Sequence, residues 1–181
     1  MASLSDIKRP VETEMREFES YFRRTLQSDI PFFHVILDNL LRRKGKQMRP
    51  LLVFLTARLN GTINETTYVA ATFIELLHTA TLLHDDVVDE ASERRGFPSI
   101  NVMYNSKIAV LAGDYLLAQG LLISVEKQSF NMLGIVSEAV REMVKGELVQ
   151  LQKTRKLDRS EDDYFRIIKM KTAALISACT A

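Results

Sequence analysis

The chain has 181 residues, enough to bury a sizeable core, and we expect residues 1–181 to form a single domain. Lys and Arg number 24 against 23 for Asp and Glu, and the net charge of +1 gives no reason to expect nucleic acid or an anionic membrane surface as a partner. Cys179 is the single cysteine, which excludes an internal disulfide, and no uninterrupted apolar stretch is long enough to span a bilayer. The first ten residues lack the apolar core of a signal peptide, so we predict a cytoplasmic protein.

Apolar residues recur at helical spacing through almost the whole chain, and no strand-like alternation is found. The sequence predicts an all-α bundle with two central, nearly all-apolar helices. The final apolar stretch has no stop signal, so we expect the chain to be cut within a helix. The predicted helices run from Leu4 to about Leu26; from Pro31 through Leu41; from Pro50 to Leu59, before the Asn60-Gly61 stop; from an N-cap at Asn64 to about Glu90; from Ser106 to Glu126; from a cap at Ser129 to about Gln152; and from Asp162 to the end, behind a capping box of Ser160 and Asp163.

Three aspartates gather at the end of the first central helix. Asp85 and Asp89 are four residues apart and share one face, and Asp86 lies beside them. The residues before them are core-like and a helix C-terminus disfavours negative charge, so this cluster is costly without a ligand. Magnesium would relieve that cost, because it binds one or two carboxylates together with substrate phosphates. The alternative is a solvated acidic helix end paired with Arg94 and Arg95.

Cationic residues lie on either side of this cluster in the sequence. The segment Gly45-Lys46-Gln47-Met48-Arg49-Pro50 places two cations in a loop just before a helix start, which suits a diphosphate. A solvated basic loop is the alternative. His78 lies seven residues before Asp85, about two turns along the same face, and could be either a ligand-binding residue or a satisfied core histidine.

These residues resemble the trans-isoprenyl diphosphate synthases, also called polyprenyl synthetases. The order and approximate separations of the motifs match that family across residues 42–181. Terpene cyclases share the aspartates, but the basic loop and the Arg pair make the combination specific. The matching segments are Gly45-Lys46-x-x-Arg49-Pro50, Leu83-His84-Asp85-Asp86-Val87-Val88-Asp89, Arg94-Arg95-Gly96, Gly113-Asp114-Tyr115-Leu116, Gly146-Glu147-x-x-Gln150 and Lys171-Thr172-Ala173.

The resemblance implies an isoprenoid synthase-like helical bundle that condenses isopentenyl diphosphate with an allylic diphosphate. In that reaction the allylic carbon–oxygen bond breaks, the isopentenyl double bond attacks the carbocation, and a proton is lost. Metal ions and cationic side chains stabilise the charge that develops on the leaving diphosphate. The implied roles are Mg²⁺ binding by Asp85, Asp86 and Asp89; contacts to the allylic diphosphate by Arg94 and Lys171; contacts to the diphosphate of isopentenyl diphosphate by Lys46, Arg49, His78 and Arg95; and lining of the reaction site by Gln150 and Thr172.

Product length is addressed by the two residues one helical turn before the aspartates. In the resembled family a bulky aromatic residue there blocks the growing chain. Ala80 and Thr81 are small, which implies an open tunnel and a medium- or long-chain product. The alternative is that these two residues only permit close helix packing.

The resemblance also predicts a second aspartate-rich motif downstream of the Lys-Thr segment, which this chain does not contain. We therefore expect an incomplete bundle whose C-terminal helices are absent. Three explanations stay open: a piece of a full synthase, a chain that works with a partner bearing the second motif, or a non-catalytic diphosphate-binding subunit. A class I terpene cyclase is a further alternative. Exposed apolar surface and the resemblance together predict a homodimer formed through the region from Ser106 to Gln152.

Overall fold

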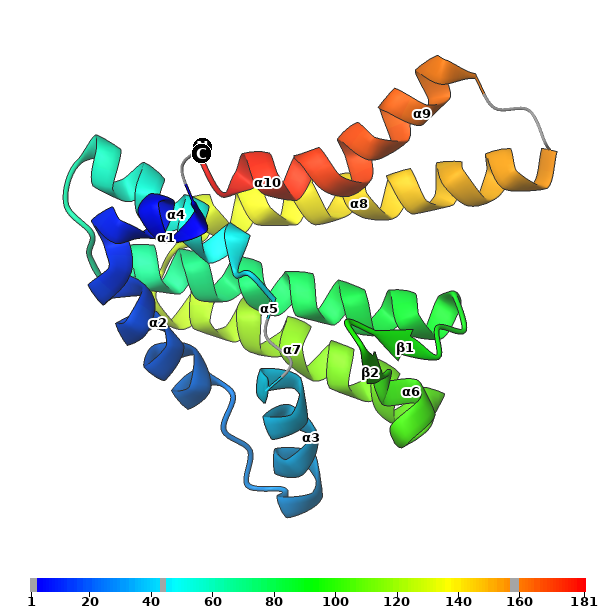
Figure 1. The fold of residues 1–181 in the computed structure, drawn as a ribbon, viewed down its shortest axis with the longest axis horizontal. Coiled ribbons are helices and arrows are strands. Elements are labelled where there is room, and N and C mark those ends of the chain that lie inside the picture. The colour runs from blue at the N-terminus through cyan, green and yellow to red at the C-terminus, as the bar shows by residue number, and fades with distance from the viewer. Residues whose placement is uncertain (1–2, 43–44, 157–159) are drawn as a thin grey trace.

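A computed structural model describes residues 3–42, 45–156 and 160–181, and within these ranges the chain is almost entirely helical. The all-α prediction is confirmed (Figure 1). In chain order the elements are α1 (Leu4–Lys8), a 3-10 turn (Arg9–Val11), α2 (Glu12–Thr25), α3 (Pro31–Arg42), α4 (Met48–Asn60), α5 (Glu65–Val88), β1 (Glu93–Arg94), β2 (Phe97–Pro98), α6 (Ile100–Met103), α7 (Ser106–Glu126), α8 (Phe130–Lys156), α9 (Glu161–Ile168), a π turn (Lys169–Ala173) and α10 (Ala174–Ala178).

The centre of the molecule is the pair of long helices α5 and α7, which run side by side (Figure 1). The start of α5 is set by the predicted cap, because the Asn64 side chain accepts a hydrogen bond from the backbone N–H of Thr67 at 3.2 Å. The start of α7 is set similarly, with the Asn105 side chain accepting from the N–H of Ile108 at 2.9 Å. Both helices therefore begin at an asparagine cap, and the apolar residues of α5 continue along the helix up to the aspartates at its C-terminal end.

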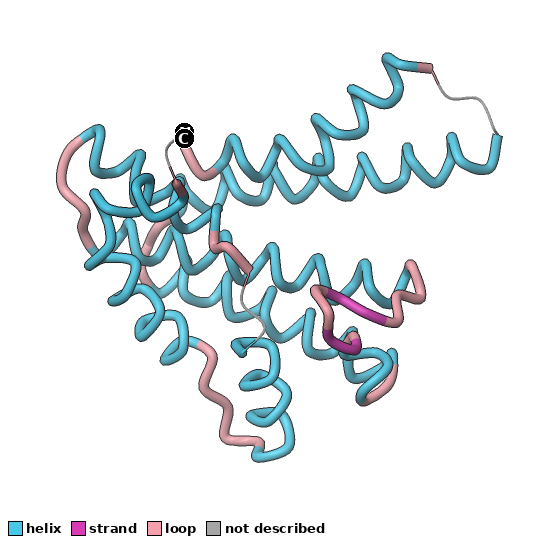
Figure 2. The backbone as a smooth tube through the Cα atoms, viewed as in Figure 1, coloured by secondary structure: helices cyan, strands magenta, loops and turns pink. Residues whose placement is uncertain are grey.

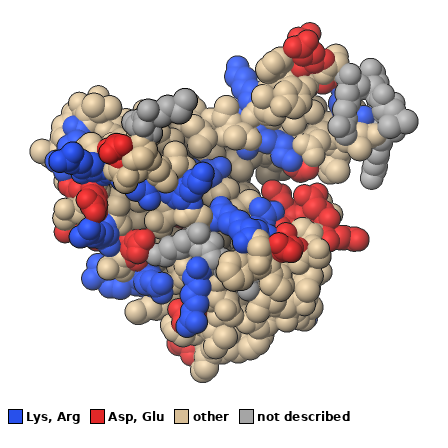
Figure 3. Space-filling view, in the orientation of Figure 1, with Lys and Arg blue, Asp and Glu red and all other residues tan. Residues whose placement is uncertain are grey.

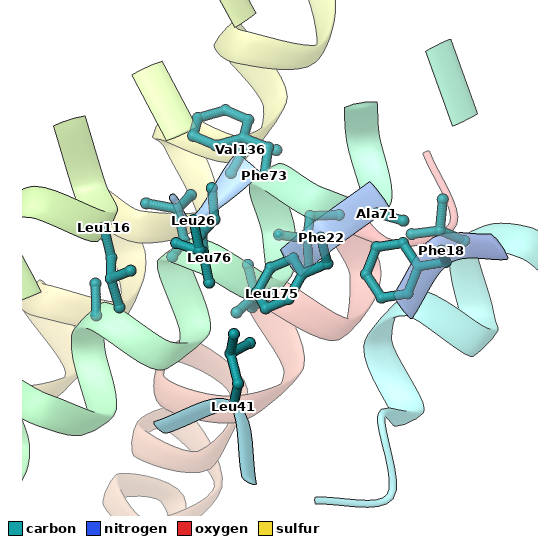
Figure 4. Packing of buried hydrophobic residues seen from close by; sticks show 14 of the residues in the cluster. Phe18, Phe22, Leu26, Leu41, Ala71, Phe73, Leu76, Leu116, Val136 and Leu175 are labelled. Atoms are coloured by element: carbon teal, nitrogen blue, oxygen red, sulfur yellow. The ribbon is translucent and has the colours of Figure 1, made fainter. Parts of the chain in front are cut away.

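Helices α2 and α4 pack against one side of this pair and form the main core with it. Figure 4 shows Phe18 and Phe22 of α2 side by side, with Ala71 of α5 near Phe18 and Leu175 of α10 near Phe22. Each of these side chains is buried. Burying an aromatic or leucine side chain stabilises the fold by about 1.5–3 kcal/mol, so residues far apart in the sequence tie α2, α5 and α10 together.

Helix α3 joins this core through the buried side chains of Ile36, Leu37 and Leu41, and it is also held by aromatic and polar contacts. The rings of Phe33 and Tyr115 meet edge to face with centroids 4.7 Å apart. The Asn39 side-chain amide donates to the Tyr104 hydroxyl oxygen at 2.9 Å. These contacts keep the C-terminal half of α3 beside the α5 and α7 pair, where it covers a cavity described below.

The C-terminal elements form an antiparallel hairpin that extends away from the central pair (Figures 1 and 2). Helix α8 packs along α9, the π turn and α10. The predicted capping box is confirmed, since the Ser160 hydroxyl accepts from the N–H of Asp163 at 3.1 Å. The Asp163 carboxylate also pairs with Lys153 of α8 at 2.8 Å, which fastens the start of α9 to α8.

Several predicted helix boundaries were wrong. The first predicted helix is divided by a 3-10 turn at Pro10, because proline cannot donate the backbone hydrogen bond that a continuous helix needs. Helix α4 begins at Met48, so Pro50 lies in its first turn, where its missing N–H costs nothing. The last predicted helix is interrupted by the π turn at Lys169–Ala173.

No pattern in the sequence predicted the strand pair between α5 and α6. The two-residue strands β1 and β2 form an antiparallel hairpin beside the end of α5, coloured magenta in Figure 2. Its turn is made by Arg95 and Gly96 with φ of 56° and 79°, a left-handed conformation. Strands this short carry no readable alternation, which is why the sequence pattern did not show them.

The prediction that no segment could span a membrane was too strict. Helix α7 is long enough and apolar enough to do so by length and composition, because its few charged residues are widely spaced. A core helix of a soluble protein passes the same test, and α7 packs along α5 with Ala109, Ala112 and Leu116 buried.

Candidate active site

The three aspartates lie at the C-terminal end of α5, as predicted, but they do not share one environment. Asp85 is half-buried, Asp86 is buried, and Asp89 is the exposed C-cap residue. A helix turns by about 100° per residue, so Asp86 points to a different side from Asp85 while Asp89 returns to nearly the same side. The helix end therefore has two chemically different faces.

Asp86 is paired within the protein. Its side chain is 4% exposed, and its Oδ1 accepts from Arg94 Nε at 2.6 Å and Nη2 at 2.5 Å. This hydrogen bond is the main reason why the pKa of Arg94 is raised. The hairpin that carries Arg94 is fixed in turn by the Ser99 hydroxyl, which donates to the Ala91 carbonyl at 2.5 Å. The alternative of an acidic helix end paired with arginine therefore describes Asp86 and Arg94, but the Asp86 carboxylate is buried and not solvated.

Asp85 faces α8 and the π turn, where a second acid meets it. Burial raises the pKa of Asp85, and the negative charges of Glu147 and Asp89 raise it further against the opposing influence of Lys171 and Arg94. Sequence reasoning gave Glu147 no role, although it lies within a matched segment. The effect of the Glu147 charge on the pKa of Asp85 could not be predicted from the sequence, because only the fold places α8 next to α5.

Lys171 and Gln150, to which the resemblance gave separate roles, come together on this α8 face. Lys171 Nζ donates to Gln150 Oε1 at 3.1 Å and forms an ion pair with Glu147. Lys171 sits in the π turn, a form of helix that is frequent at functional sites. A Cβ added to Gly146 would lie 2.8 Å from Met170 Cβ and 3.0 Å from Lys171 Cγ, so glycine is required for α8 to approach this turn. Thr172 is exposed and lines a shallow apolar groove instead.

A cavity of about 100 Å³ lies on the other face of α5, under α3. One end is apolar, with leucines from α3, α5 and α7, and the other end is polar. The polar end brings together two residues predicted to bind diphosphate, His78 and Arg95, with the Asp86–Arg94 pair. The residues that line the polar end are Gly45, Gln47, Glu75, His78, Asp86, Arg94 and Arg95.

Arg49 adds positive charge to this polar end from the first turn of α4. It is half-buried, its Nε has no hydrogen-bond partner, and burial lowers its pKa. Burial, together with the positive charges of Arg49, Arg95 and Arg94, lowers the pKa of His78 to about 3. His78 is therefore a neutral imidazole at physiological pH. Lys46 is exposed just before α4, in the loop whose residues 43 and 44 lie outside the described ranges.

Figure 3 shows basic and acidic side chains gathered next to one another on one face of the molecule, below the C-terminal hairpin. The described residues combine a cation-lined cavity and a carboxylate-bearing helix end within one region. Such an arrangement can hold one anionic group directly through cations and another through a metal ion.

Comparison with known proteins identifies the family. Residues 30–181 match the family described as Polyprenyl synthetase. The chain belongs to this family. It is 33% identical over 175 residues to octaprenyl diphosphate synthase of Haemophilus influenzae, covering 97% of this chain and 53% of that protein. It is also 36% identical over 160 residues to heptaprenyl diphosphate synthase component 2 of Bacillus subtilis, covering 88% of this chain and 46% of that protein.

The fold agrees with solved structures of the family. The polyprenyl synthase of Caulobacter crescentus, complexed with calcium and isoprenyl diphosphate, superposes with a TM-score of 0.92 at 35% identity. The match covers 98% of this chain and 54% of that one. The chain thus has the isoprenoid synthase fold and spans about half the length of the relatives it matches.

The predicted chain-length residues lie where the family resemblance put them, one turn before Asp85. Ala80 is 2% exposed and packs in the hydrophobic core. Thr81 is half-buried, and its hydroxyl donates to the His78 carbonyl at 2.9 Å. Neither contact tests whether these residues leave a tunnel open, so their influence on product length stays a prediction.

The donor set at the end of α5 fits a magnesium ion only in part. Among the described residues there is no cluster of three or more His, Cys, Asp or Glu side chains placed to hold a metal. Asp85 and Asp89 share a face, and burial together with the negative charges of Glu147 and Asp89 raises the pKa of Asp85. Two such carboxylates suit Mg²⁺, which takes its remaining ligands from water and phosphate. Asp86 is instead engaged by Arg94.

Proposed function

We propose that this chain contributes to a prenyltransferase that condenses isopentenyl diphosphate with an allylic diphosphate to give a medium- or long-chain polyprenyl diphosphate. The observation that carries the proposal is the placement of a cation-lined cavity and a carboxylate-bearing face on the two sides of one helix end. Each half would bind one diphosphate, and α5 would set the distance between the two reacting ends.

The cavity side would bind isopentenyl diphosphate. Arg49 and Arg95 would neutralise the diphosphate charge, with Lys46 at the entrance. Neutral His78 would donate a hydrogen bond without adding charge. The apolar end of the cavity would exclude water from the hydrocarbon part. Positioning of this kind lowers the barrier by holding the double bond against the reacting carbon.

The α8 side would bind and ionise the allylic diphosphate. Asp85 and Asp89 would hold magnesium, which supplies electrostatic stabilisation of the departing diphosphate when bound. Lys171 would donate to the same diphosphate, and Gln150 would hold the lysine in place. Arg94 would reach the allylic diphosphate from its position on Asp86. Thr172 would approach this site only from the outer side of the π turn.

The size of the product would depend on the α5 residues one turn before Asp85. Ala80 and Thr81 offer no bulky side chain on this stretch, and the relatives named above are octaprenyl and heptaprenyl synthases. We infer that a growing polyprenyl chain passes along this stretch. Ala80→Phe would then shorten the products without preventing the first condensation.

The assembly would be a dimer formed through α7 and α8. Large apolar side chains lie exposed on both helices, which favours burial against another chain. A second copy is the occupant we propose, while the relative named as component 2 supports a different partner as the competing possibility. The exposed apolar residues are Val110, Leu111, Leu121, Leu122 and Val125 on α7 and Phe130, Ile135, Val144, Leu148 and Leu151 on α8.

A binding and coupling experiment on the 181-residue chain tests this function. Calorimetry would measure isopentenyl diphosphate binding, and a coupling assay with Mg²⁺ and farnesyl diphosphate would size any products by mass spectrometry. We expect binding to weaken at least tenfold in Arg49→Ala and to change little in Asp85→Asn. Products longer than the primer would show a competent site, while binding without product would indicate dependence on a partner. No binding by the unaltered chain would contradict the proposal.

A further inference from the structure

Glu75 lies inside the cation-lined cavity, where an anionic substrate is proposed to bind. It is on α5, one turn before His78, and it lines the same polar end as Arg95. Neither the motifs nor the proposed reaction assigns it a role. Glu75 is half-buried, and a carboxylate next to a binding site for diphosphate repels the ligand, so its presence there calls for a physical reason.

The titratable groups that act on Glu75 from outside α5 come from three elements. Arg49 approaches from α4, Arg95 from the β1–β2 turn, and the Cys179 thiol from the end of α10. Two titratable residues of its own helix line the cavity with it: His78, which is neutral, and Asp86, which is paired with Arg94. Burial raises the pKa of Glu75, and Arg49 and Arg95 oppose that rise. Burial also raises the pKa of Cys179 to about 11, so the thiol contributes no charge at physiological pH.

Arg95 lines the cavity, and Arg49 acts on Glu75 and His78 from the first turn of α4. Arg95 has a left-handed backbone with φ of 56°, and its guanidinium lies against Gly45 so closely that a Cβ there would meet Nη1 at 2.3 Å. Arg49 is half-buried in the first turn of α4. Two cations in a site of low dielectric repel one another and lose hydration, so a nearby carboxylate stabilises them while no substrate is bound.

We propose that Glu75 is a positioning residue, the counter-ion that holds Arg49 and Arg95 at the cavity until the substrate's diphosphate takes them over. This role rests on the function proposed above. Glu75 then stabilises the free protein and competes with the ligand for the same two guanidinium groups. Loss of its charge has opposite effects on the two states: the free protein becomes less stable, and the diphosphate binds more tightly.

The test compares Glu75→Gln with Glu65→Gln, which removes an exposed carboxylate paired with Lys127 on the same helix. Isopentenyl diphosphate binding would be measured by calorimetry, and thermal unfolding would be followed with and without it. We expect Glu75→Gln to lower the Tm of the free chain. We also expect it to tighten binding by about tenfold, the size of effect that a neighbouring charge has when it shifts a pKa by one. Glu65→Gln should leave the affinity unchanged.

The competing outcomes are distinguishable. Unchanged or weaker binding by Glu75→Gln would contradict the counter-ion role, since a purely structural residue would weaken both stability and affinity. No binding by the unaltered chain would instead contradict the proposed function, and this role with it. If Glu75→Gln does not fold, the double variant with Arg49→Gln removes one charge of each sign. Recovery of folding in that variant would support the role, and failure to recover would overturn it.

Discussion

The two faces of the α5 end both carry carboxylates and cationic side chains, but the charges are paired differently on each face. On the cavity face, Asp86 is buried and bound to Arg94, and the positive charges of Arg49 and Arg95 act on Glu75. On the α8 face, Asp85 meets further negative charge from Glu147 and Asp89. Lys171 is the cation at this second face, and it is already shared with Glu147 and Gln150.

This difference separates structural carboxylates from carboxylates that can accept a cation. A buried acid with its own arginine contributes to the fold, because removing either partner leaves an uncompensated charge. An acid surrounded by other acids gains from any positive ligand. The adjacent residues Asp85 and Asp86 therefore have different roles, although they belong to one motif.

The largest effect should come from removing one cation from each face. Arg94→Ala leaves the buried Asp86 carboxylate unpaired and should destabilise the chain by about 3 kcal/mol. Lys171→Ala should cost only about 1 kcal/mol, because its ion pair with Glu147 is partly exposed. Urea unfolding of both variants gives the comparison. Equal losses would mean that the two faces do not differ as described, and the double variant Asp86→Ala with Arg94→Ala should recover part of the larger loss.

The next effect concerns the approach of α8 to the π turn. Gly146→Ala places a Cβ against Met170 and Lys171 and should cost about 2 kcal/mol through overpacking. Gly134→Ala is the matched control on the same helix, since a Cβ there meets nothing within 4 Å. That control should be neutral or gain up to about 1 kcal/mol from helix propensity. Similar stability of the two variants would show that α8 can shift away from the turn at little cost.

The neutral state of His78 predicts a pH dependence of stability. Its pKa is about 3 in the folded chain and about 6.5 when unfolded, so the unfolded chain binds the proton first as the pH falls. Stability is therefore present above pH 6.5 and is lost below it, by about 1.4 kcal/mol between pH 7.5 and 5.5. Thermal unfolding at a series of pH values should show a shallower decline for His78→Gln. An identical pH profile for both proteins would show that His78 does not titrate on unfolding.

The smallest effect is expected at Asp85. Burial and like-charge repulsion raise its pKa, so protonation favours the folded state, and Asp85→Asn should stabilise the free chain by about 0.5 kcal/mol through relief of both costs. The same variant should lose the stabilisation that Mg²⁺ with inorganic diphosphate gives to the unaltered chain. A thermal shift retained in full would exclude Asp85 as a ligand of the metal.

Much of the fold could be predicted because its signals are local. The Asn64 cap and the Ser160 capping box are hydrogen bonds between residues three apart, and both formed as predicted. Apolar periodicity located the long helices for the same reason. Boundaries were missed where the backbone departs from regular helix, as in the π turn, which packs closely against Gly146.

The sequence by itself determined that an acidic helix end and several cations exist, and the matched motifs placed the chain in its family. Only the tertiary structure decided which charge meets which. In it Asp86 pairs with Arg94, the charge of Glu147 acts on Asp85, and the charges of Arg49 and Arg95 act on Glu75. The physical reason is that electrostatic energies depend on distance and burial, and both are fixed by contacts between helices that lie far apart in the chain.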